Sequence, residues 1–160
     1  MSNANDTGQY VLFRLGNEEY GLPIELVSSI IRYEPATPVP HAPPSVEGVI
    51  NLRGRVIPVV NLKRRLLDAP YEPTVVSRIV VAEGEGGSVG LAVDAANEVA
   101  FIAAEDVKPP PETALTPETA EAFAGVAEHN GKLVILLNLD RALPRTEYGT
   151  VTQQEVETDG

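Results

Sequence analysis

The sequence of 160 residues contains no cysteine and no tryptophan. Without cysteine the chain can form no disulfide bond and can offer no thiolate as a metal ligand or nucleophile. It also lacks an apolar run near the ~18 residues that a membrane-spanning helix needs, and residues 1–8 have neither the basic nor the hydrophobic region of an export signal. We therefore expect a cytoplasmic protein that does not insert directly into a membrane.

Basic residues and aromatic side chains are both scarce. Lysine and arginine number 12 against 23 acidic residues, and the resulting formal net charge of −11 opposes binding to the phosphates of nucleic acid. Three phenylalanines and five tyrosines are few for the lining of a small-ligand cavity. With 43% hydrophobic and 22% charged residues, the composition is that of a globular protein. An enzyme, a small-ligand binder and a protein-interaction module remain as candidate classes.

Short runs rich in valine, isoleucine and leucine recur between glycines and prolines, and such runs indicate the strands of an all-β barrel or sandwich. The predicted strands are Tyr10–Leu15, Glu19–Leu22, Ser29–Arg32, Val49–Leu52, Arg55–Val60, Val75–Glu83, Ser88–Val93, Glu98–Ile102, Phe123–His129 and Lys132–Leu137. A few short helices are also predicted, two of them after an asparagine that can cap the first turn. These helices are Leu62–Leu67 after Asn61, Leu139–Leu143 after Asn138, and one around Ile24–Ser28.

An internal repeat organises these elements, because residues 48–66 match residues 125–143 at a constant offset. The matched pairs are Gly48/Gly125, Val49/Val126, Gly54/Gly131, Asn61/Asn138, Leu62/Leu139, Arg64/Arg141 and Leu66/Leu143. Asn130-Gly131 is typical of a type I′ hairpin turn, and Gly54 has the same place after Arg53. Two copies are too few for a solenoid and favour a pseudo-twofold pair of small barrels.

The domain organisation follows from the repeat and from the ends of the chain. Residues 9–147 are predicted to form one domain of two barrel subdomains. Residues 1–8 are predicted to be a disordered tail and residues 148–160 an acidic, flexible tail. The proline-rich residues 35–44 and 109–117 are predicted to be rigid crossovers within this single domain, because proline restricts the backbone.

The sequence contains no motif that would bring a nucleophile, a base and an orienting acid together around either histidine. His41 lies among prolines and His129 beside a turn, and neither has a nucleophile or a second metal ligand at a suitable spacing. The glycine-rich residues 83–90 miss the dinucleotide-binding spacing and lack a P-loop lysine, so we interpret them as a hairpin turn. The sequence therefore predicts no catalytic residue, no metal site and no cofactor.

A basic segment stands out in this acidic chain. Five of the 12 basic residues fall within residues 53–65, which contain no acid: Arg53, Arg55, Lys63, Arg64 and Arg65. The last three fit either the solvated face of a short helix or a binding surface. Arg53 occupies a tight turn that favours asparagine or aspartate, which points to a function or a specific salt bridge. Pro58 lacks an N–H group, which favours a position on an edge strand or at a bulge. If its strand is at the edge, that edge either binds a partner or is protected by the proline against aggregation.

Residues 48–62, with the sequence GVINLRGRVIPVVNL, resemble the central motif of CheW-type chemotaxis coupling proteins. Matches continue in the same order at GNEEYG, residues 16–21, and at LVILLNLD, residues 133–140. The resemblance covers about residues 9–143 and implies two intertwined five-stranded Src-homology-like β-barrels. It further implies a non-enzymatic adaptor that couples methyl-accepting chemoreceptors to the histidine kinase CheA in signalling arrays at the membrane.

Carried onto this sequence, the resemblance implies partner-binding roles for Gly48, Asn51, Arg53, Gly54, Arg55 and Val27. The implied partners are the CheA regulatory domain, which has the same fold, and the cytoplasmic tip of the receptors, which binds where the two barrels meet. Self-association in rings is a further expectation. Many members carry a glutamate at the position of Ser29 that pairs with the motif arginine, so Arg53 is expected to lack that partner and to bind a partner carboxylate instead.

Two alternatives remain open at this point. The first is an adaptor of a related chemosensory pathway, for instance one that controls type IV pili, which these residues do not distinguish from chemotaxis. The second is a small-ligand-binding double barrel, which the scarcity of aromatic residues disfavours.

Overall fold

The computed structural model describes residues 8–109 and 121–143, and the structural statements below concern those residues. The tails expected at residues 1–8 and 148–160 lie outside them, apart from Gly8, as does most of the second proline-rich crossover. The elements in chain order are β1 (Gln9–Leu15), β2 (Glu18–Pro23), η1 (Ile24–Leu26), β3 (Val27–Arg32), β4 (Val46–Leu52), β5 (Arg55–Asn61), α1 (Leu62–Leu67), β6 (Arg78–Gly84), β7 (Gly87–Val93), β8 (Ala95–Phe101), η2 (Ala104–Asp106), β9 (Phe123–His129), β10 (Lys132–Leu137) and α3 (Leu139–Ala142).

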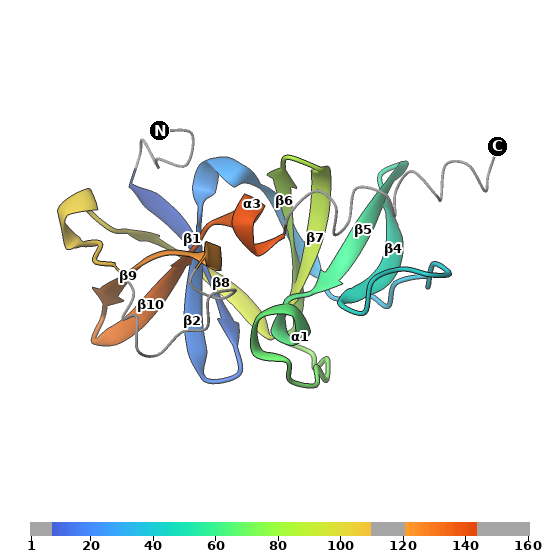
Figure 1. Ribbon diagram of the computed structural model, residues 1–160, viewed down its shortest axis with the longest axis horizontal. Coiled ribbons are helices and arrows are strands. Elements are labelled where there is room, and N and C mark those ends of the chain that lie inside the picture. The colour runs from blue at the N-terminus through green and yellow to red at the C-terminus, as the bar shows by residue number, and fades with distance from the viewer. Residues whose placement is uncertain (1–7, 110–120, 144–160) are drawn as a thin grey trace.

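These strands form two five-stranded barrels, which lie side by side in Figure 1. The strand order is β8-β1-β2-β10-β9 in barrel A and β3-β6-β7-β5-β4 in barrel B. In each barrel one central pair is parallel, β2 with β10 and β7 with β5, and the other neighbours are antiparallel. Each barrel combines two strands from one half of the sequence with three from the other. The matching order confirms the predicted duplication and the intertwined arrangement.

Three apolar clusters make up the core. One lies within barrel A and includes Leu12, and another lies within barrel B and includes Ile57. The third and largest is shared by both barrels, because it contains Phe13 of barrel A and Leu91 of barrel B. Complete burial of such a side chain contributes about 1.5–3 kcal/mol. Separation of the barrels would expose the shared cluster to water, so the two barrels form one folding unit.

In each barrel a residue outside the named strands pairs with the edge strand in the same way. In barrel B, Thr37 N donates to Val49 O over 2.8 Å and Val49 N donates to Thr37 O over 2.9 Å. In barrel A, Lys108 and Val126 exchange the same two bonds, each 2.8 Å long. A Cβ atom at Gly48 would lie 2.0 Å from Thr37 O. Glycine at this position therefore allows the first proline-rich crossover to pair with β4.

The tips of the β4–β5 and β9–β10 hairpins have the predicted turn geometry. The φ angles are 54° at Arg53 and 84° at Gly54, and 54° at Asn130 and 77° at Gly131. Positive φ at both central residues is the pattern of a type I′ turn, whose twist suits antiparallel strands. Arg53 consequently occupies the position that asparagine occupies in the second copy.

Asparagine caps start both short α-helices, as the sequence predicts. Asn61 Oδ1 accepts a hydrogen bond from Arg64 N at 3.0 Å, and Asn138 Oδ1 accepts one from Arg141 N at 3.3 Å. Helix α3 ends one residue earlier than expected. The helix expected around Ile24–Ser28 is only the three-residue 3₁₀ turn η1, because the following residues belong to β3.

The position of Pro58 differs from the expectation. Its strand β5 is not an edge strand, since it lies between β4 and β7, and Pro58 is buried. The pairing of β5 with β7 begins only at Val59, where Val59 is in register with Gly90. Pro58 thus precedes the ladder that would require its missing N–H group, which explains how an interior strand accommodates a proline.

Candidate partner-binding site

The tip of the β4–β5 hairpin carries four of the predicted partner-binding residues, Asn51, Arg53, Gly54 and Arg55, and all four are exposed. Asn51 Oδ1 accepts a hydrogen bond from Gly54 N at 2.9 Å. The left-handed conformation of Arg53 costs a residue with a Cβ atom about 1 kcal/mol. The Asn51 side chain therefore stabilises the turn that holds Arg53 at the end of the molecule.

The two arginines at this tip differ in their surroundings. Arg55 Nη2 donates to Ser88 Oγ, which lies 2.8 Å from both carboxylate oxygens of Glu83. The Arg53 guanidinium makes no hydrogen bond or ion pair with any residue in 8–109 or 121–143. Ser29 lies on β3, at the opposite edge of the strand order from β4. Within the described residues, the whole Arg53 guanidinium is consequently left for a partner carboxylate, whereas Arg55 already uses Nη2.

The other two predicted site residues, Gly48 and Val27, are less accessible. Gly48 is buried in β4 under Thr37, as described above. Val27 begins β3, is half-buried, and packs against the core that the barrels share. Burial therefore limits the direct contact that either residue could make with another molecule.

The basic segment at residues 53–65 does not form one patch, because β5 separates its two ends. Lys63 Nζ on α1 lies 3.5 Å from Asp94 Oδ2, and the same carboxylate oxygen accepts a hydrogen bond from Gly16 N at 2.6 Å. Arg65 Nε donates to Ala142 O over 3.1 Å, from α1 of barrel B to α3 of barrel A. These contacts hold the two barrels together, a role that the sequence analysis did not assign to either cation.

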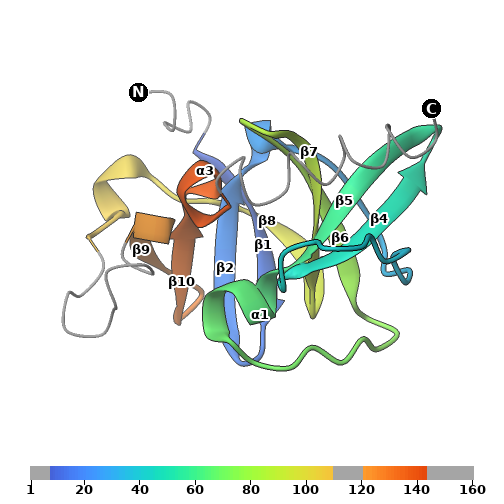
Figure 2. The same ribbon diagram turned by 45° about the vertical axis from the view of Figure 1, so that its right-hand side comes forward.

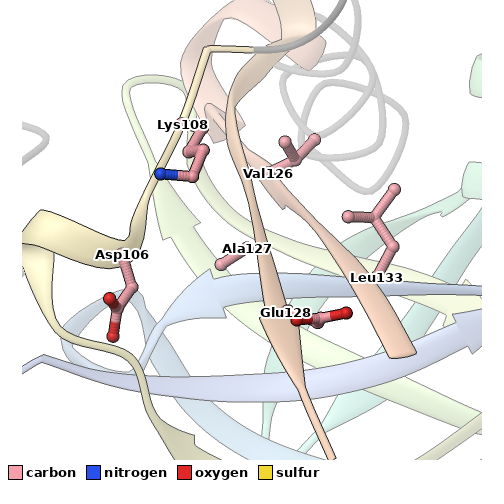
Figure 3. A pocket seen from close by; sticks show the side chains of 6 residues that line it. All are labelled: Asp106, Lys108, Val126, Ala127, Glu128 and Leu133. Atoms are coloured by element: carbon pink, nitrogen blue, oxygen red, sulfur yellow. The ribbon is translucent and has the colours of Figure 1, made fainter. Parts of the chain in front are cut away.

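The far end of barrel A has an open groove of about 480 Å³ that the sequence analysis also missed. Figure 3 shows its lining: two residues that follow β8 along the chain, and four from the β9–β10 hairpin. They are Asp106, Lys108, Val126, Ala127, Glu128 and Leu133. Leu133 is an exposed leucine, with 59% of its surface accessible. The internal repeat could have pointed to this surface, because it places Glu128 at the position that Asn51 has in the predicted partner-binding hairpin.

The two ends of the molecule differ in charge. The groove of barrel A contains the carboxylates of Asp106 and Glu128 together with the ammonium group of Lys108, and His129, which follows Glu128, lies 2.9 Å from Glu98 Oε2 through its Nε2 atom. The tip of barrel B carries Arg53 and Arg55 instead. Figures 1 and 2 both show the β9–β10 and β4–β5 hairpins at opposite ends of the molecule. The two ends of the pseudo-twofold fold therefore differ: one presents the arginines of the β4–β5 tip, and the other presents two carboxylates beside Lys108.

The residues that the structure describes contain no group of three or more histidine, cysteine, aspartate or glutamate side chains arranged to hold a metal ion. Within the same residues, no helix has the length and apolar character needed to cross a bilayer. Two intertwined barrels with exposed hairpin ends of different charge define a protein-interaction module of the double-barrel class.

Comparison with known proteins identifies the family. The model of the CheW-like domain matches residues 9–147, and the chain belongs to the CheW-like family. It is 39% identical over 152 residues to the chemotaxis protein CheW of Rhizobium meliloti, which covers 92% of this chain and 97% of that protein. Protein FrzA of Myxococcus xanthus is 28% identical over 154 residues, 95% of each chain.

A solved structure supports the same assignment. The crystal structure of the scaffolding protein TtCheW from Thermoanaerobacter tengcongensis matches with a TM-score of 0.75 and 34% identity, over 87% of this chain and 89% of that one. The resemblance stated from the central motif is confirmed. As a member of this family the chain is a scaffold adaptor and not an enzyme.

Proposed function

We propose that this protein couples methyl-accepting chemoreceptors to the histidine kinase CheA in chemotaxis arrays, to which it is recruited from the cytoplasm. The observation that carries the proposal is the β4–β5 tip, where Arg53 of this acidic protein has no side-chain partner among the residues that the structure describes. A cation held in a strained turn at the end of a barrel is suited to pair with a carboxylate of another macromolecule.

The kinase and the receptor would use different parts of the molecule. The regulatory domain of CheA would contact the β4–β5 end, through Arg53 with Asn51 and Gly54 holding the turn. The receptor tip would bind at the junction of the barrels, whose geometry depends on the Lys63–Asp94 and Arg65–Ala142 contacts. Coupling follows if simultaneous binding stabilises one state of the kinase more than another, because only differential affinity shifts a conformational equilibrium.

The charge difference between the two ends supports the further proposal of self-association. Arg53 of one copy can pair with the carboxylate of Asp106 or Glu128 in the groove of the next, which also contains Lys108. Such a head-to-tail contact is heterologous, and it produces a ring if the rotation closes. Copies of this chain would then assemble into rings, alone or together with the homologous kinase domain.

A related chemosensory pathway is the alternative function. The similarity to Protein FrzA of Myxococcus xanthus, over nearly the full length of both chains, favours it. The alternative keeps the adaptor role and the same Arg53 contact, and it changes the identity of the receptor and kinase. Binding measured against kinase regulatory domains from each kind of pathway in the same organism separates the two functions.

The variant Arg53→Asn tests the proposed contact. Asparagine tolerates the left-handed conformation and is the residue of the second copy, so this variant removes the charge and relieves the strain. We expect the protein to become more stable by about 1 kcal/mol while its affinity for the CheA regulatory domain falls at least tenfold in calorimetric titration. The control is Lys132→Asn, a charge removal at the tip of the other hairpin, where Lys132 is the repeat counterpart of Arg55, and it should leave kinase affinity unchanged. Unchanged affinity of Arg53→Asn for both kinase domain and receptor tip would refute the assignment.

A further inference from the structure

Two arginines lie directly opposite each other on neighbouring strands of barrel B. Arg32, at the end of β3, is in register with Arg78, at the start of β6. Opposed residues of an antiparallel pair project from the same face of a sheet, and like charges in this arrangement are destabilising. In a protein with a net charge of −11, an opposed cation pair needs an explanation. Neither residue belongs to the hairpin tip or to the junction described above.

The structure holds Arg78 in place by hydrogen bonds to the chain that precedes β6. Arg78 Nη1 donates to Val75 O over 3.1 Å and to Ser77 O over 2.8 Å. The same loop is tightened by a hydrogen bond of 2.8 Å from Thr74 N to Ser77 Oγ. Nε and Nη2 of Arg78 make no hydrogen bond to any residue of 8–109 or 121–143, and neither does the Arg32 side chain. The Arg78 side chain is therefore held in position before any partner binds, and its Nε and Nη2 groups can still donate hydrogen bonds to another molecule.

These arginines line an open groove of about 350 Å³ together with Tyr33, Thr74, Val75 and Ser77. Among residues 8–109 and 121–143, no acidic residue lines it. Of the neighbouring acids, Glu34 is exposed and follows Tyr33, whereas the half-buried Glu47 carboxylate already accepts a hydrogen bond of 3.0 Å from the Tyr33 hydroxyl. The positive charge of the groove is thus not neutralised by a carboxylate within it.

One exposed apolar side chain, Val75, lines the groove, and two more are close to its lining residues in the sequence. Val75 is 93% exposed and Val76 48%, and both precede β6 although the sequence predicts a strand from Val75 onward. Ile30, which projects from the same face of β3 as Arg32, is 40% exposed. Two arginines in register beside exposed aliphatic side chains match a segment in which carboxylates alternate with apolar residues.

We propose that this groove binds an acidic segment of a partner protein, with a carboxylate between Arg32 and Arg78 and an apolar side chain against Val75. Charge complementarity selects this occupant: an anion between the arginines removes their repulsion, and the valines contact its apolar neighbour. The groove includes β3, at the opposite edge of barrel B from β4, so its occupancy does not depend on the contacts proposed for Arg53.

Titration of the full ¹⁵N-labelled chain, followed by nuclear magnetic resonance, tests this site. The probe is an acetylated, amidated peptide Leu-Glu-Leu-Glu, and the matched probe replaces both glutamates with glutamine. We expect the acidic peptide alone to shift the Val75 and Val76 amide signals and the Nε–H signals of Arg32 and Arg78. Arg32→Gln should weaken its binding at least fivefold, whereas Arg141→Gln, on α3, should not.

The choice of Arg32 keeps the test informative, because Arg78→Gln would also remove the bonds to the loop and could disorder it. In a second arm the probe is inorganic phosphate at the same concentration. Phosphate that shifts the arginine signals while the peptide does not would overturn the protein-segment proposal in favour of a small-anion site. Equal responses to both peptides, or equal loss of affinity in the two variants, would exclude a carboxylate site altogether.

Discussion

Substitution of Gly48 by alanine examines the most specific backbone contact in the fold. A Cβ atom there would lie 2.0 Å from Thr37 O and 2.5 Å from Thr37 C, both of them backbone atoms. The φ angle of Gly48 is +146°, which residues with a Cβ atom rarely adopt. The crossover must therefore move away from β4, and its two hydrogen bonds with Val49 are lost.

The magnitude follows from these two effects. Two backbone hydrogen bonds contribute about 1 kcal/mol each, and the strained φ costs a further 1–3 kcal/mol, so we expect a loss of about 3–5 kcal/mol. The total free energy of unfolding of a domain is about 5–15 kcal/mol, so Gly48→Ala should remain folded near room temperature but be strongly destabilised. Its remaining folded fraction should bind the kinase domain with nearly normal affinity, because Gly48 is buried.

The controls are alanine substitutions at two further glycines of these hairpins, Gly54 and Gly125. Gly54 has no atom within 4 Å of its would-be Cβ, so only the positive φ of +84° opposes Gly54→Ala, at about 1–2 kcal/mol. Gly125→Ala should be milder than Gly48→Ala, since its nearest contact is the end of a side chain, Val107 Cγ1 at 2.6 Å. Guanidinium unfolding followed by circular dichroism measures all three. A Gly48→Ala variant within 1 kcal/mol of Gly54→Ala would refute the reasoning.

Three further outcomes are expected. Asn51→Ala removes the bond to Gly54 N and should cost about 1 kcal/mol in chemical unfolding, with a smaller loss of kinase affinity than Arg53→Asn; an equal or larger loss would place Asn51 in direct contact. Asn61→Ala removes the cap of α1 and should also cost about 1 kcal/mol, which Asn61→Ser should largely restore. Burial raises the pKa of Tyr71 to about 12 against about 10 when unfolded, so the unfolded chain deprotonates first and stability should fall as the pH rises above about 10. Tyr71→Phe should lessen that fall in urea titrations between about pH 10 and 12, and an identical pH profile would contradict the assigned cause.

The candidate site was only partly accessible to sequence reasoning. Arg53 stood out because turn chemistry favours asparagine at its position, a local rule that needs no tertiary information. The opposite charge of the barrel A groove was not predicted, because Asp106 reaches it from a segment distant in sequence from Glu128. The Arg32–Arg78 pair was missed for the same reason, since 45 residues of chain separate two side chains that strand register brings together.

The sequence by itself determined the strands, the capped helices, the type I′ turns and the duplication, because each depends on neighbouring residues or on a repeat that is visible along the chain. The family resemblance implied that the barrels are intertwined, but only the tertiary structure decided which strands are exchanged and which cations remain available. Lys63 and Arg65 hold the barrel junction and Arg55 bonds to Ser88, whereas Arg53 has no such bond to any residue that the structure describes. The physical reason is that the effect of a charge depends on the groups within a few ångströms of it, and in this fold those groups come from distant parts of the chain.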